Sequence, residues 1–250
     1  MIKIEKTEVV GWEPAIRGMR NPKNSWGRSD TMFGLYGVVP DRCIKCDIDC
    51  IIDDDTDVCL GPNDHNLMMN LAAGGPVHAK YRRMITVYVD ITAPLYWWKE
   101  FDTYKIGTVA NSCSTMHKIH DKEFTREDFS CDKLMDNDYI HEPDDSLVTL
   151  PMHVLDITIS TMNYYREKFI EAKTKPMKEE AKRAELMKKY WEQLIQLLPS
   201  SYNQKRTIML NYEVLAGIYP MRKNHKLDEW HVFCDWIKSL PHSEIIVGEK

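Results

Sequence analysis

The sequence contains no apolar run of about 18 residues, so no segment of it is expected to cross a membrane as a helix. Its first residues, MIKIEKTEVVGWEP, lack the continuous apolar stretch of a secretory signal. Basic residues are not in surplus, since the formal net charge is −5, and this argues against nucleic acid as the main partner. Seven cysteines without a secretion signal are best explained as reduced thiols. We therefore expect a cytoplasmic protein that binds neither a membrane nor nucleic acid.

The chain also lacks internal repeats and any linker long enough to separate domains. Its 250 residues, 43% hydrophobic and 28% charged, can bury one sizeable core. Residues 1–60 are rich in loop formers and are expected to be irregular, and residues 121–150 are expected to form an exposed acidic insertion. The sequence predicts a single α/β (α+β) domain over residues 1–250, with a central sheet and long C-terminal helices.

Apolar β-branched residues alternate with more polar ones from Ile85 to Ile91, which predicts a strand. Before it, Asn63 or Asp64 can cap a short helix that ends at Gly74. After it, Thr92 can cap a helix that runs to about Tyr104.

Further helices are predicted from the spacing of apolar residues in the second half of the chain. They span residues 152–175, 178–198, 207–218 and 227–240. Lys175-Pro176 ends the first of them, because the residue before proline is disfavoured in helical geometry.

The segment APLYWWKEFDTYKIGTVANSCSTM, residues 93–116, carries a recognisable spacing. It resembles the flavin-dependent thymidylate synthases, whose signature Arg-His-Arg-x-x-Ser-x4-Ser-x-Arg follows a strand and a helix that begins near Ala-Pro. Counted without gaps from Ala93-Pro94, the signature falls on Thr103, Tyr104, Lys105, Thr108, Cys113 and Thr115. Lys105 keeps a positive charge and Thr108 keeps a hydroxyl, whereas most of the other reactive side chains are replaced.

A second match lies near the C-terminus, in LPSSYNQKRTIMLNYEVL. As in the family, a Leu-Pro is followed by an asparagine, here Asn211, and then in order by Arg222, His225 and Trp230. Two positions depart from the family pattern. Glu213 stands where the family has a flavin-contacting arginine, and Ile195 stands where it has a phosphate-binding arginine.

The two matches cover about residues 75–240, and what they imply follows from the family. The resemblance implies a fold of the thymidylate-synthase-complementing-protein type and a homotetramer with active sites at subunit interfaces. It implies FAD as cofactor and dUMP as ligand. It also implies an enzyme of the flavin-dependent nucleotide C5-methyltransferase type, which uses NADPH and methylenetetrahydrofolate.

Transferred position by position, the resemblance gives the expected site. The substrate-binding residues are expected to be Lys105, Thr108, Ser112, Ser114 and Arg222. The cofactor-binding residues are expected to be His78, Arg83, Tyr104 and Asn211. A serine-rich turn offers hydroxyl and N–H groups to a phosphate, and an arginine offers two parallel donors. Four residues before the strand are candidates to replace the missing cationic groups: His78, Lys80, Arg82 and Arg83. The alternative is that they are ordinary solvated surface charges.

The cysteines leave two further questions. Cys113 stands where the family has a substrate-contacting serine and is the one candidate nucleophile, the alternative being an inert thiol. Cys43, Cys46, Cys50 and Cys59 invite comparison with a zinc site, with His65 nearby. Structural zinc sites usually present two well-spaced pairs, so we expect reduced thiols and no metal.

Two functions fit these residues. In the first, the chain is a divergent flavin-dependent thymidylate synthase-like protein that binds a pyrimidine nucleotide, with a flavin, and modifies the base. In the second, it is a catalytically inactive fold relative that acts as a nucleotide-binding or assembly protein.

Overall fold

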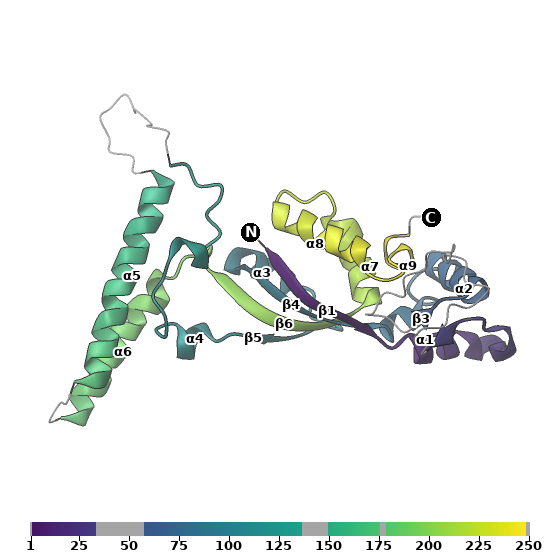
Figure 1. Ribbon diagram of the computed structural model, residues 1–250, viewed down its shortest axis with the longest axis horizontal. Coiled ribbons are helices and arrows are strands. Elements are labelled where there is room, and N and C mark those ends of the chain that lie inside the picture. The colour runs from purple at the N-terminus through teal and green to yellow at the C-terminus, as the bar shows by residue number, and fades with distance from the viewer. Residues whose placement is uncertain (1, 34–57, 137–149, 176–178, 249–250) are drawn as a thin grey trace. The chain divides into compact units, whose positions relative to one another are not determined.

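The computed structural model describes residues 2–33, 58–136, 150–175 and 179–248, and they group into two compact units (Figure 1). Unit 1 holds Thr92–Phe101 and Ser112–Arg206, and unit 2 holds Ile2–Ile91, Asp102–Asn111 and Thr207–Lys250, in each case for the described residues. A short strand, which the sequence also allows from Gly34 to Val39, lies outside the described part, and the single-domain organisation stays a prediction.

Within the described ranges, the main sheet has four strands in the order β1-β4-β6-β5. They are β1 (Lys3–Val10), β4 (Thr86–Pro94), β6 (Asn203–Asn211) and β5 (Val109–Ser112). The predicted strand is confirmed as β4, in which Val87, Val89 and Ile91 are buried and Tyr88 is exposed. A second, antiparallel pair joins β2 (Met32–Phe33) to β3 (Val58–Cys59), with Met32 opposite Cys59. Sheet and helices together confirm the mixed α/β class.

Besides its part of the sheet, unit 2 contains α1 (Trp12–Arg20), α2 (Pro62–Ala73), α7 (Tyr212–Arg222), α8 (Asp228–Ser239) and α9 (Glu244–Val247). Short 3-10 turns η1 (Asn21–Lys23), η2 (Trp26–Arg28) and η3 (Lys80–Arg83) connect them. The core contains aromatic pairs. The ring centres of Trp12 and Tyr212 are 5.5 Å apart and those of Trp230 and Phe233 are 5.7 Å apart, each pair in an edge-to-face arrangement. Such pairs add to the stabilisation that burial provides.

The α2 helix confirms the predicted helix before β4, but Asn63 and Asp64 do not cap it. The helix begins at Pro62, where a missing N–H leaves no bond unmade. The Asp64 carboxylate instead accepts hydrogen bonds from residues 29–31 and from Arg20.

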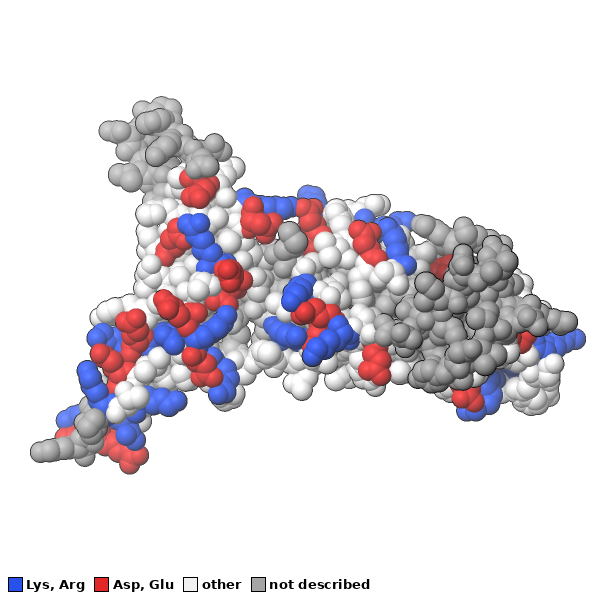
Figure 2. Space-filling view, in the orientation of Figure 1, with Lys and Arg blue, Asp and Glu red and all other residues white. Residues whose placement is uncertain are grey.

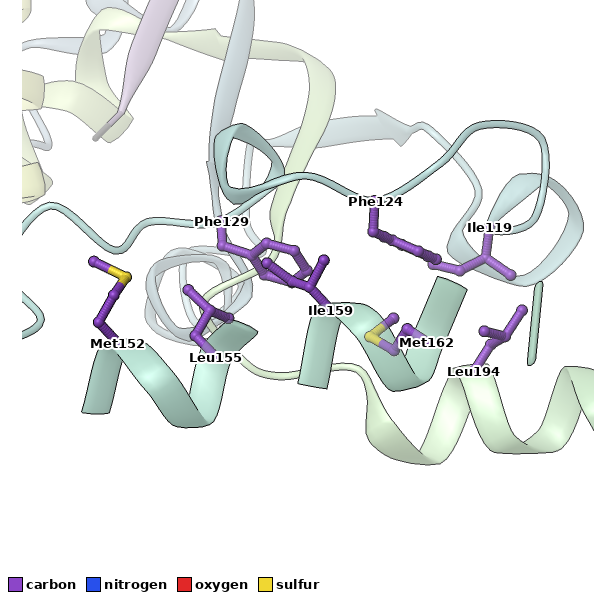
Figure 3. Packing of buried hydrophobic residues seen from close by; sticks show 8 residues of the cluster. All are labelled: Ile119, Phe124, Phe129, Met152, Leu155, Ile159, Met162 and Leu194. Carbon is purple, nitrogen blue, oxygen red and sulfur yellow. The ribbon is translucent and has the colours of Figure 1, made fainter. Parts of the chain in front are cut away.

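Unit 1 contains α3 (Leu95–Phe101), α4 (Thr115–Lys118), η4 (Arg126–Asp128), α5 (Pro151–Thr174) and α6 (Glu180–Leu197). The long helices α5 and α6 pack side by side (Figure 1). Figure 3 shows a hydrophobic cluster between one face of these helices and the segment before them, which consists of Ile119, Phe124, Phe129, Met152, Leu155, Ile159, Met162 and Leu194. The insertion predicted over 121–150 is therefore not exposed throughout, because Phe124 and Phe129 are core residues.

Three further predictions are wrong in part. Residues 1–60 are not irregular throughout, since β1 and α1 occupy residues 3–20. The period of β1 is hidden because Lys6 adopts a left-handed φ of 52°, which shifts the alternation of exposed and less exposed residues by one position.

The start of the helix predicted for residues 207–218 is also wrong, because β6 continues to Asn211 and α7 begins at Tyr212. Thr92 and Pro94, likewise, end β4 and do not open α3. The helices predicted for 152–175, 178–198 and 227–240 are confirmed by α5, α6 and α8. Over the described residues, no helix has the length and apolar character required to cross a membrane.

Candidate functional site

Tyr104 and Arg222, two predicted site residues 118 positions apart, are in contact within unit 2. Arg222 is the last residue of α7 and donates its Nε–H to the Tyr104 hydroxyl oxygen at 2.7 Å. Its guanidinium carbon lies 4.4 Å from the ring centre of Trp230 on α8 and 5.4 Å from that of Tyr104. A cation over aromatic faces is attracted by their quadrupoles, so these two rings fix the position of the charge.

The loop that carries Tyr104 also lies against the first turn of α7. Gly107 has a φ of 78°, and a Cβ on it would come within 3.0 Å of Val214 and 3.2 Å of the Asn211 side-chain nitrogen. Asn211 caps α7 through its Oδ1, which accepts the Val214 N–H at 3.1 Å. Sequence reasoning missed Gly107, although a glycine in a polar loop is the usual signal for a left-handed turn.

Thr108 is the predicted site residue whose polar group has most to gain from a ligand. Its Oγ1 is buried and makes no hydrogen bond with the described residues. Buried hydroxyls are nearly always bonded, so this atom marks a place where an added donor or acceptor would be stabilised. Its neighbours Lys105 and Ile106 are exposed, Ile106 to 92%, and all four residues of β5 are exposed.

Ser112, Cys113 and Ser114 belong to unit 1, where β5 ends and α4 begins. The backbone of Cys113 is held on both sides: its N–H donates to the Lys205 carbonyl at 2.9 Å, and its carbonyl accepts from Gln204 Nε2 at 2.8 Å. The Ser114 hydroxyl accepts the His117 N–H at 3.0 Å as the cap of α4. The Cys113 residue is exposed. The convergence of this segment with Arg222 stays a prediction, as do the roles assigned to the site residues.

The short turn η3 supplies the remaining cationic residues. His78, just before it, and Arg83 within it are exposed. Arg82 is 8% exposed, and its Nη1 lies 3.6 Å from the carboxylate of Glu213. The negative charge that departs from the family pattern at Glu213 is thus balanced by Arg82.

Tyr81 fixes this turn to α2. Its hydroxyl donates to the Met68 carbonyl at 2.9 Å, and burial raises the pKa of Tyr81 to about 12, so the phenol stays protonated as a donor.

Charged side chains of both signs are intermixed on the face seen in Figure 2, without a basic field across its described residues. Among the described residues, no three His, Cys, Asp or Glu side chains gather into a group that could hold a metal ion. Cys43, Cys46 and Cys50 lie outside those residues, and Cys59 is half-buried in β3.

No protein-family model matches the sequence, and no curated protein matches it either. Solved structures do match. Thymidylate synthase X (ThyX) from Helicobacter pylori, with FAD and dUMP, aligns with 99% of this chain and 98% of its own at 13% identity and a TM-score of 0.57. A second structure of that enzyme with FAD and dUMP covers 98% and 99% of the two chains at 13% identity and a TM-score of 0.56.

The UMP/dUMP methylase PolB from Streptomyces cacaoi, bound to 5-Br UMP, aligns with 99% of this chain and 94% of its own, at 12% identity and a TM-score of 0.52. Identities this low carry the fold and leave the activity open. The chain is therefore a divergent structural relative of the flavin-dependent thymidylate synthases and has their fold over almost its whole length.

Proposed function

We propose that this protein binds a pyrimidine nucleotide together with FAD. The observation that carries the proposal is the extent of the match: structures of proteins crystallised with dUMP or 5-Br UMP align with 98–99% of this chain. A fold kept end to end retains the positions on which a site can be built, even where side chains have changed.

On the nucleotide side, Arg222 and Thr108 are the strongest candidates. Arg222 is held in place by Tyr104 and Trp230, so little side-chain entropy remains to be lost when a phosphate binds. The buried Thr108 hydroxyl makes no hydrogen bond with the described residues. Lys105, Ser112 and Ser114 complete the proposed substrate-binding set.

On the cofactor side, the residues present fit a flavin dinucleotide through His78, Arg83, Tyr104 and Asn211. The first two are exposed cations or potential cations next to the buried Arg82, so this end of unit 2 can face a pyrophosphate despite Glu213. When bound, the flavin would supply two-electron redox chemistry. The protein's own groups would bind and orient it.

The proposed activity is modification of a pyrimidine base by a route other than the family's standard reaction. The alternative is a nucleotide-binding or assembly protein without catalysis, and one observation favours it. Ile195, at the position of a phosphate-binding arginine in the family, packs half-buried against the hydrophobic cluster of unit 1. That position is part of the core here, so it cannot carry a charge to a ligand.

Purified protein tests the proposal directly. We expect flavin absorption after FAD is added and excess is removed, and heat on titration with dUMP that is reduced in the Arg222→Ala variant. A protein that retains no flavin and takes up no dUMP would overturn the proposal. Binding of both ligands without change to the base, with reductant and folate present, would select the non-catalytic alternative.

We further propose that the protein is a homotetramer. Exposed apolar side chains support an assembly: Val154, Ile157 and Tyr164 of α5 are 49%, 51% and 55% exposed, and their spacing places them on one helix face. Light scattering at micromolar concentration should give four times the mass of the chain. A monomer would contradict both the assembly and a site shared between subunits.

A further inference from the structure

Unit 2 contains a cavity of about 740 Å³, and none of the residues assigned above to substrate or cofactor lines it among the described residues. Its lining comes from three elements: α2, the buried Arg82 of η3, and the C-terminal turn from Glu244 to Gly248. Small-molecule sites in proteins usually have volumes of about 300–1,000 Å³ and combine an apolar wall with a few polar groups. The size of the cavity is therefore that of a ligand site.

The charged groups that line the cavity already have polar partners. His65 Nε2 and Glu244 Oε1 are 2.9 Å apart, and His242 Nδ1 lies 3.6 Å from the same oxygen. On the other side, Arg82 is paired with Glu213 at 3.6 Å. A phosphate or carboxylate would approach Glu244 as well as Arg82, so the cavity favours an uncharged ligand over an anion.

One buried donor in the cavity lining, in contrast, lacks a hydrogen-bond acceptor among the described residues. The Arg82 side chain is 10% exposed, and its Nε–H has no acceptor among the described residues. A buried donor left unbonded is destabilising, so a ligand with an uncharged oxygen acceptor would be stabilised at this position.

The face of α2 that lines the cavity supplies both kinds of polar group and an apolar wall. Asn66 and Asn70 are four residues apart and therefore neighbours on the helix surface, and each amide offers a donor and an acceptor. Met69, Ala72 and Ala73 lie beside them, and a thioether packs well against an aromatic ring.

We propose that this cavity is a second binding site, for an uncharged heterocycle that carries a carbonyl next to an N–H. The carbonyl accepts from Arg82 Nε, the asparagine amides bond the remaining ring edge, and the ring lies on Met69. Bases and nucleosides of the uracil type have this edge. The site is separate from the proposed nucleotide site, which depends on a phosphate and on Arg222.

Uridine is the probe, and 3-methyluridine is its matched control, because methylation removes the N–H and leaves ring and carbonyls. We expect uridine to bind the wild-type protein by calorimetry or ligand-observed NMR, and 3-methyluridine to bind at least threefold more weakly. Asn70→Ala should weaken uridine binding about threefold to tenfold, the usual effect of one neutral hydrogen bond. Asn63→Ala, on the same helix but outside the cavity lining, should leave it unchanged.

A double variant, Arg82→Met with Glu213→Gln, removes the donor without leaving a buried charge alone, and it should lose uridine binding to a similar degree. Arg222→Ala separates the two sites: uridine binding should persist, whatever happens to dUMP. The proposal is overturned if uridine does not bind, if 3-methyluridine binds equally well, or if Arg222→Ala removes uridine binding while Asn70→Ala does not. Failure of the proposed function would appear separately, as absent dUMP and flavin binding in the wild-type protein.

Discussion

Asp64, on α2, is a charged residue in the interior of unit 2. Its carboxylate is fully buried and accepts from Arg20 Nε at 2.6 Å, from the Ser29 and Thr31 hydroxyls at 2.7 Å each, and from two backbone N–H groups. Burial alone would raise the pKa of Asp64, but the hydrogen bonds from Thr31, Ser29 and Arg20 outweigh it and lower that pKa. The carboxylate therefore ties α1 and α2 to the segment before β2.

We predict that Asp64→Ala lowers the free energy of unfolding by about 3–5 kcal/mol, because Arg20 is left buried without its counter-charge. The lowered pKa gives the pH dependence. Asp64 stabilises the fold fully above its unfolded pKa, and the stabilisation is lost as pH falls through the lower folded value. Urea unfolding between pH 7 and pH 3 measures both effects. Equal stability of wild type and variant at pH 7 would contradict the prediction.

Arg222 gives a second prediction at this scale. Arg222→Ala should weaken dUMP binding by about 1.5–3 kcal/mol, the range for a charge-assisted contact. Tyr104→Phe is the matched variant, because it keeps the ring under the guanidinium and removes the acceptor for Nε. It should weaken dUMP binding less than Arg222→Ala does. If Arg222→Ala leaves dUMP affinity unchanged while the protein remains folded, Arg222 is only a structural cation packed on Trp230.

Arg222 and Asp64 differ in how well the sequence alone identified their contacts. The family resemblance assigned Tyr104 to the cofactor and Arg222 to the substrate of one site, because a motif fixes positions along the chain. The same reasoning gave Asp64 a local capping role, and its actual partners lie 33 to 44 residues away. Nothing in a local pattern identifies a carboxylate whose hydrogen-bond donors come from a distant loop.

At the scale of elements, helices were easier to predict than strands. The helices α5 and α6 have long apolar stripes and a proline between them, which local spacing reveals. In β6, Gln204, Ile208 and Leu210 are buried, but Lys205 and Arg206 are both half-buried. The alternation of buried and less buried residues is therefore interrupted. The apolar run that continues into α7 then favours a helix for the whole segment.

The packing of α6 provides a prediction at this scale. Leu194 is the α6 side chain that is fully buried in the cluster of Figure 3, whereas Leu197 on the same helix is 39% exposed. Leu194→Ala should lower the free energy of unfolding by about 2–5 kcal/mol, because it leaves a cavity as well as removing apolar contact. Leu197→Ala should have a much smaller effect. Chemical denaturation of both variants checks this, and similar losses for the two would contradict the assigned core.

For the whole molecule, the resemblance predicted the fold better than composition or periodicity did. Two spacing patterns over about residues 75–240 indicated a family whose solved structures align with 98–99% of the chain. Backbone positions are shared by many sequences, so spacing survives at 13% identity. Chemistry depends on individual groups, and most of the reactive ones have changed.

The same distinction leads to a prediction about activity. Thr103 and Tyr104 replace an arginine and a histidine of the family signature, and Glu213 and Ile195 replace two further arginines. Glu213 is neutralised by Arg82, and Ile195 belongs to the core of unit 1, so neither can supply the missing charge to a ligand. We expect little or no conversion of dUMP to dTMP with FAD, NADPH and methylenetetrahydrofolate. Each lost charge-assisted bond weakens ligand or transition-state binding by about 1.5–3 kcal/mol, and the losses multiply as rate factors.

A spectrophotometric or radiochemical assay of purified protein, run beside Helicobacter pylori ThyX as positive control, tests this expectation. A second experiment restores the family residues at two positions, with Tyr104→His and Glu213→Arg in one variant. If lost charge is the cause, they should raise flavin affinity even without restoring turnover. Glu213→Arg would also place two guanidiniums together at Arg82, so the variant needs Arg82→Gln in the same chain to avoid their repulsion. Robust dTMP formation by the wild-type protein would show that other residues have taken over these roles, and Arg82 would be the first to examine.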